Sequence, residues 1–119
     1  MERTMIYWYR DLYMDDKVAA NPERCKRRVE KRRPWKKSYV TVTLASNEQN
    51  LFEIMETRQL FFRRFTYLDF YVVGLASTYD KAVELLQKIL VEGYQADASF
   101  QPRKCFRKED FSQQQKIRK

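Results

Sequence analysis

The chain has no histidine, only two glycines and only two cysteines among its 119 residues. Without histidine, Ser-His-Asp and Cys-His catalysis are excluded, and so are zinc sites that need histidine at the usual spacing. Cys25 and Cys105 lie far apart and form no CxxC pair, so we expect two reduced thiols. The shortage of glycine also argues against a glycine-rich phosphate loop.

Long apolar runs are missing as well. No run approaches the ~18 residues that a membrane helix needs, and the first residues lack the layout of a signal peptide. We therefore expect a cytoplasmic protein that does not contact membranes. Hydrophobic residues make up 44% of the chain and aromatic residues 15%, which favours a globular fold over disorder. The length predicts a single domain over residues 1–110, followed by a polar, frayed tail over 111–119.

The net charge of +8 is distributed unevenly. Residues 22–37 contain nine Lys or Arg and two acids, and residues 103–119 contain seven and two. The rest of the chain contains eight basic and twelve acidic residues. Two basic segments are thus attached to a mildly acidic body.

Several segments have clear secondary-structure patterns. Residues 5–10 and the alternating residues 39–45 predict strands, and the continuous apolar run 70–76 predicts a central parallel strand. Asn21-Pro22-Glu23 predicts the start of a helix that runs to about residue 33. Residues 78–92 predict a helix that ends at Gly93, and residues 99–106 an edge strand because they include Pro102.

The tripeptide Leu-Ala-Ser occurs at residues 44–46 and again at residues 75–77. A capping-box pattern follows each copy, which predicts a helix after Ser46 and another after Ser77. The resulting order is β-α-β-α-β-α with one further short strand at the end. This order predicts an α/β fold with three helices on a mostly parallel sheet of three or four strands.

The ends of these strands are the first place to expect a ligand, because open α/β sheets bind ligands there. The candidate pocket residues are Ser46, Asn47, Ser77 and Thr78. Acidic residues in the following helical turns would repel an anion, so we interpret Ser46 and Ser77 mainly as helix caps.

Four acidic residues near strand ends could together hold Mg²⁺: Asp11, Asp15, Asp16 and Asp69. Their spacing matches no acidic motif, and we interpret them mainly as turn residues. The sequence therefore predicts no catalytic residue, no metal ligand and no cofactor. A metal-assisted phosphoester hydrolase stays an alternative that ranks third, after the two binding functions given below.

The basic segment 23–37 is the most distinctive candidate for binding. Its cations could neutralise several phosphates, and Trp35, or Tyr7, Trp8 and Tyr9, could stack on unpaired bases. The alternative is a solvated helix face with Trp35 in the core. The candidate nucleic-acid-binding residues are Arg27, Arg28, Lys31, Arg32, Arg33, Trp35, Lys36 and Lys37.

The stretches MIYWYRDLY, VTVTLASNEQNLFEIM and YVVGLASTYDKAVELL together resemble a group of small uncharacterised bacterial proteins. The resemblance covers most of residues 5–107 and implies an intracellular bacterial protein with a repeating βα fold. It implies no activity, ligand or catalytic residue.

Taken together, the residues favour a non-catalytic binding or protein-interaction module. The alternative is a nucleic-acid-binding protein that uses segment 23–37, with RNA or single-stranded DNA as the partner. If no nucleic acid binds, an acidic protein is the candidate partner of this segment. Aromatic residues are dense over 60–73, and any that remain exposed would favour a homo-oligomer such as a homodimer.

Overall fold

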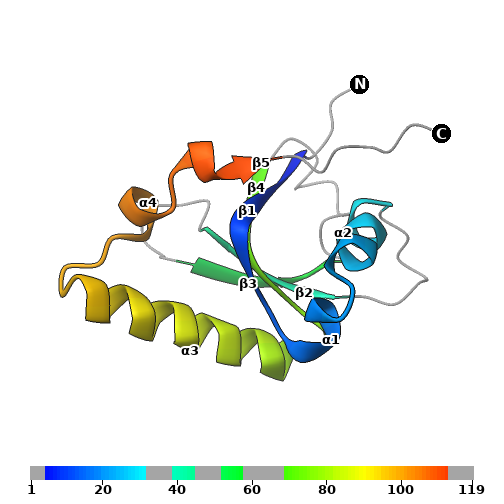
Figure 1. Ribbon diagram of the computed structural model, residues 1–119, viewed down its shortest axis with the longest axis horizontal. Helices are drawn as coiled ribbons and strands as arrows, with labels where there is room; N and C mark the ends of the chain where they lie inside the picture. The colour runs from blue at the N-terminus through cyan, green and yellow to red at the C-terminus, as the bar shows by residue number, and fades with distance from the viewer. Residues whose placement is uncertain (1–4, 32–38, 45–51, 58–68, 113–119) are drawn as a thin grey trace.

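The computed structural model describes residues 5–31, 39–44, 52–57 and 69–112, and the statements below concern these residues (Figure 1). Their secondary structure follows in chain order: β1 (Met5–Met14), α1 (Asp16–Ala19), α2 (Pro22–Lys31), β2 (Val40–Leu44), β3 (Phe52–Glu56), β4 (Asp69–Ala76), α3 (Tyr79–Ala96), α4 (Pro102–Cys105), a 3-10 turn (Lys108–Asp110) and β5 (Phe111–Ser112).

The five strands form one mixed sheet in the order β3-β2-β4-β1-β5. β1 and β4 are parallel, whereas the pairs β2/β3, β2/β4 and β1/β5 are antiparallel. The predicted α/β class and the central place of β4 are confirmed. The prediction of a mostly parallel sheet is wrong, and so is the repeating βα order that the resemblance implied.

The main reason is β3, which occupies a segment where the capping pattern after Ser46 predicted a helix. Phe52–Glu56 instead pairs with the whole of β2, from Leu44 opposite Phe52 to Val40 opposite Glu56. An antiparallel neighbour that follows β2 directly needs no helical crossover. The second βα unit is therefore replaced by two antiparallel strands.

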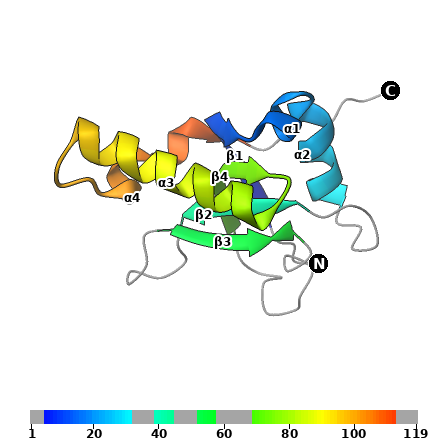
Figure 2. The same ribbon diagram turned by 90° about the horizontal axis from the view of Figure 1, so that it is seen from below.

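Helices cover both faces of the sheet (Figures 1 and 2). On one face, α1 and α2 place Val18, Cys25 and Val29 in a core with side chains of β1 and β4. On the other face, α3 places Ala82, Leu85 and Ile89 against β2 and β4. Because alternate residues of a strand point to opposite faces, the central strands supply side chains to both cores.

The region after β4 departs from the prediction in two places. α3 does not end at Gly93 but continues to Ala96. Gly93 lies against the ring of Phe100, and a Cβ at this position would lie 2.5 Å from Cε2 of that ring. The predicted strand over 99–106 is wrong, since Pro102 begins the short helix α4. Phe111 and Ser112, at the start of the segment expected to be a tail, pair with β1 as β5.

Candidate functional site

The carboxyl ends of the parallel strands β1 and β4 lie side by side, with Met14 opposite Leu75. After β1 the chain passes to α1 and α2 on one face, and after β4 it passes to α3 on the other. Ligands of open α/β sheets bind at such a divergence. The strand ends bring Asp15 next to Ser77, which lies 62 positions later in the sequence and directly precedes Thr78.

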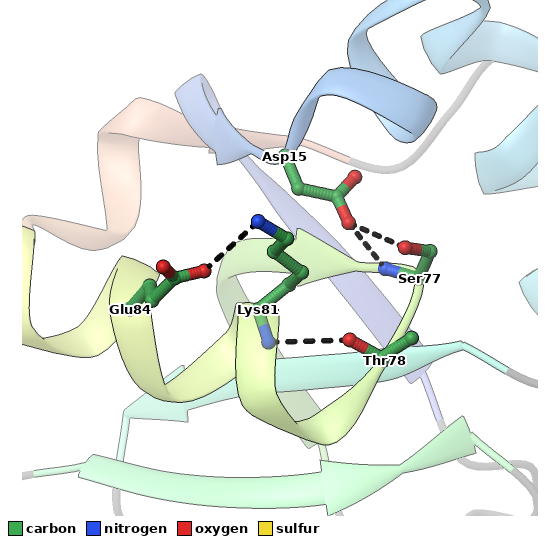
Figure 3. A network of polar contacts seen from close by, with 5 residues as sticks. All are labelled: Asp15, Ser77, Thr78, Lys81 and Glu84. Atoms are coloured by element: carbon green, nitrogen blue, oxygen red, sulfur yellow. Dashed lines mark hydrogen bonds and ion pairs between the residues drawn. The ribbon is translucent and has the colours of Figure 1, made fainter.

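At this strand end Asp15 is only 9% exposed, and its carboxylate accepts three hydrogen bonds, two of them from Ser77 (Figure 3). Its Oδ1 accepts from the Val18 N–H at 2.9 Å, which caps α1. Its Oδ2 accepts from the Ser77 N–H at 2.8 Å and from the Ser77 hydroxyl at 2.6 Å. A negatively charged group of the protein itself therefore binds the backbone N–H at the end of β4, which an anionic ligand would otherwise use.

The same contacts determine the ionisation of Asp15. Burial by itself raises the pKa of this carboxyl group, but the hydrogen bonds from Ser77 and Val18 and the charge of Lys81 lower it. The net result is a pKa below the ordinary value of 3.8. Asp15 is thus an anion at neutral pH and links the ends of β1 and β4.

The cap of α3 is Thr78 rather than Ser77. The Thr78 side chain accepts from the Lys81 N–H at 3.2 Å, and Lys81 forms an ion pair with Glu84 at 3.3 Å (Figure 3). The prediction that Ser77 caps this helix is wrong, because its hydroxyl donates to Asp15 instead. Ser46 and Asn47 lie outside the described residues.

The acidic residues considered for Mg²⁺ do not gather at one place. Asp69 pairs with Met5 at the start of the parallel pair, whereas Asp15 and Asp16 follow its end, a separation of roughly 25 Å along an eight-residue strand. Asp11 forms an ion pair with its neighbour, with its Oδ2 3.5 Å from Nε of Arg10. Among the described residues, no group of three or more acidic or cysteine side chains could hold a metal ion.

Helix α2 carries the described part of the basic segment 23–37. Asn21 accepts from the Arg24 N–H at 3.2 Å and so caps the helix as expected. Cys25 and Val29 are buried against the sheet, while Arg24, Arg27 and Arg28 are exposed. We call these three arginines the α2 basic face.

Part of the predicted surface lies beyond what the structure describes. Of the candidate residues, Arg27 and Arg28 belong to the α2 basic face, and α2 ends at Lys31. The side chain of Lys31 lies outside the described residues, as do Arg32, Arg33, Trp35, Lys36 and Lys37. Arg24 was missed as a candidate, although its spacing of three and four residues from Arg27 and Arg28 places all three on one helix face.

The aromatic residues of β1 do not supply a stacking surface beside this helix. Trp8 is 2% exposed and lies in the core beneath α2. Tyr7 stacks on Tyr71 at 5.1 Å between ring centroids, and Tyr9 packs edge-on against Phe106 at 4.9 Å. Both tyrosines belong to the opposite core, beside α3.

A further polar contact joins β1 to α3, and the sequence patterns did not indicate it. The Tyr13 hydroxyl donates to Glu92 Oε1 at 2.8 Å. Burial, this hydrogen bond and the charge of Glu92 raise the pKa of Tyr13 to about 12. Tyr13 is therefore a neutral hydrogen-bond donor at physiological pH.

No family model, curated protein or solved structure matches this chain. The resemblance to small bacterial proteins stays a prediction, as does the cytoplasmic location. No helix among the described residues has both the length and the apolar composition needed to cross a membrane.

Proposed function

We propose that the protein is a non-catalytic binding module that holds the phosphate backbone of a nucleic acid against the α2 basic face. The observation that carries this proposal is the division of α2 into two sides. Cys25 and Val29 attach the helix to the sheet, and the arginines project from the other side into solvent. Such a surface can replace the counterions of several phosphates.

The charge of α2 is only partly balanced within the helix. Pro22–Lys31 contains five basic residues and two glutamates, Glu23 and Glu30. Glu30 accepts from Trp8 Nε1 and so extends toward the sheet, and Glu23 lies 3.9 Å from Lys26. Within the described part of the chain, neither Arg24 nor Arg27 forms an ion pair. Their charge is therefore available to an anionic partner.

The strand end beside Asp15 is the weaker candidate for a binding site. Its polar groups bond to one another, and its carboxylate would repel phosphate. The α2 basic face has the opposite character, because it is exposed and cationic. Phosphate binding therefore agrees with the geometry of α2 and not with that of the strand end.

The test is a fluorescence-anisotropy titration of labelled nucleic acid at several salt concentrations. We expect binding at about 50 mM salt and a linear fall of log affinity with log salt. The variant Arg24→Gln/Arg27→Gln should reduce the slope by up to about two units, since each lost phosphate contact removes roughly 0.7 to 0.9.

The matched control is Lys81→Gln/Lys88→Gln, which removes the same charge from α3 on the opposite face of the sheet. This variant should leave the slope unchanged. Equal effects of both variants would mean that only net charge matters and would contradict a defined surface on α2. Absence of binding at low salt would reject the nucleic-acid function and leave an acidic protein as the partner to test.

A further inference from the structure

Among the described residues, the aromatic rings that side chains of α2 contact are buried. Trp8 of β1 and Tyr39, directly before β2, are 2% and 4% exposed and belong to the core beneath α2. The described aromatic side chains that are most exposed, Tyr79 and Tyr94, lie on α3, which covers the other face of the sheet.

Side chains of α2 hold these two rings in place. Lys26 Nζ lies 5.8 Å from the centroid of the Trp8 ring, and Trp8 Nε1 donates to Glu30 Oε2 at 3.4 Å. Arg28 donates from a terminal nitrogen to the Tyr39 hydroxyl at 3.3 Å. A base could stack on either ring only if α2 left the sheet and exposed Cys25 and Val29.

This arrangement bears on which nucleic acid can bind. Proteins that bind single strands gain about 1–3 kcal/mol from each base that stacks on an aromatic ring. The described part of the α2 surface has cations without an accessible ring, so a single strand would gain only phosphate contacts there. A duplex offers more of these, with one charge per about 1.7 Å of its axis.

From this we infer that the α2 basic face binds double-stranded nucleic acid in preference to single strands and without reading the base sequence. The inference rests on the proposed function. α2 is about 15 Å long, as ten helical residues are, and it presents Arg24, Arg27 and Arg28 within little more than one turn. Its ligand is the regular double row of phosphates, which DNA and RNA duplexes share.

The experiment compares a DNA duplex of about 20 base pairs, an RNA duplex of the same sequence and each separated strand, all at one low salt concentration. We expect at least one of the two duplexes to bind about tenfold more tightly than any single strand. A second duplex of unrelated sequence should bind as tightly as the first. A preference between the two types would identify the natural ligand, and either type supports the inference.

A spectroscopic arm tests the buried ring directly. The chain has two tryptophans, so in the variant Trp35→Phe the fluorescence comes from Trp8 alone. Saturating single strand should leave this emission unquenched, since the ring stays beneath α2. Quenching of Trp8, or single-strand affinity equal to duplex affinity, would overturn the inference. A preference for single strands that is lost in Trp35→Ala would also overturn the inference, but it would leave the proposed function intact. If no nucleic acid binds, the proposed function itself is rejected.

Discussion

The two main helices cover opposite faces of one sheet but divide their residues differently. The 18-residue α3 buries Ala82, Leu85 and Ile89 and packs its half-buried leucines against the same core. Of its described residues, the ten-residue α2 buries only Cys25 and Val29, and it directs Arg24 and Arg27 into solvent. Since apolar burial drives folding, the longer α3 should contribute more to stability, whereas the exposed surface of α2 carries the greater positive charge.

The polar contacts of the two helices follow the same division. Ser77, two residues before α3, bonds to Asp15 at the end of β1, and Glu92 of α3 accepts from Tyr13 of β1. α2 uses Glu30 and Arg28 to hold rings of the core and directs Arg24 and Arg27 outward. The comparison teaches that one small sheet can support a helix for stability and another for charge, and the predictions below test that separation.

The largest expected effect is at Ile89, which is 1% exposed. Ile89→Ala should lower the free energy of unfolding by about 2–5 kcal/mol, because it removes buried methylene groups and leaves a cavity. Val29→Ala is the matched change on α2 and should cost less, since it removes a smaller group from a thinner layer. Urea unfolding of both variants measures the difference. An equal or larger loss at Val29 would contradict the leading role of α3.

Gly93 should show the next largest effect. Gly93→Ala should destabilise by about 1–3 kcal/mol, because the new Cβ meets the buried ring of Phe100. Helix propensity acts the other way and favours alanine by about 1 kcal/mol. In a Phe100→Leu background the contact is relieved, so the same substitution should become neutral or stabilising. If its cost is the same in both backgrounds, the close packing of Phe100 is not the cause.

The Asp15 link comes third. Asp15→Asn should destabilise by about 1–3 kcal/mol at pH 7, because the amide cannot accept all the hydrogen bonds from Val18 and Ser77. The pKa of Asp15 is lower in the folded state than in the unfolded chain. Its contribution is therefore complete above the ordinary value of 3.8 and is lost as pH falls through the lower folded value.

The matched control is Asp16→Asn, since Asp16 is the exposed residue that follows Asp15 and begins α1. Unfolding of both variants and the parent chain is measured between pH 7 and about pH 2. The difference in free energy of unfolding between Asp15→Asn and the parent chain should disappear at the acid end of this range. If this difference instead grows on acidification, or if Asp16→Asn lowers the free energy of unfolding as much as Asp15→Asn does, Asp15 does not stabilise the fold as a carboxylate.

The elements that the sequence predicted well are those in which one local pattern dominates. The continuous apolar run of β4 indicated a strand covered on both faces, and the structure places it at the centre of the sheet. The alternation in β2 and the Asn21 cap of α2 were also sufficient. In these segments the apolar spacing fits one type of secondary structure, so local propensity and tertiary contacts agree.

The two Leu-Ala-Ser copies show where local pattern fails. The copy at residues 75–77 is followed by α3, which has several turns of apolar spacing. The copy at residues 44–46 is followed by β3, in which Phe52, Ile54 and Met55 fit a helix face as well as a strand. Five residues cannot distinguish the two periods, and the pairing with β2 decides between them.

The candidate site divides in the same way. The exposure of Arg27 and Arg28 on α2 could be predicted because charge and helical spacing are local properties of one segment. The Asp15–Ser77 link joins residues that are 62 positions apart, and it exists only because β1 and β4 are parallel neighbours. Strand order depends on long-range pairing, so the interpretation of Asp15 as a turn residue missed its partner.

The smallest expected effect on stability is at the α2 basic face itself. Arg24→Gln/Arg27→Gln should change the free energy of unfolding by no more than about 0.5 kcal/mol, because both side chains are exposed and glutamine has a similar helix propensity. Removing like charges three residues apart should even stabilise slightly, by about 0.2–0.5 kcal/mol, and salt should screen that gain. Urea unfolding at low and high salt measures both quantities. A loss above about 1 kcal/mol would mean that the arginines support the fold, and the separation between a stabilising α3 and a ligand-binding α2 would then be wrong.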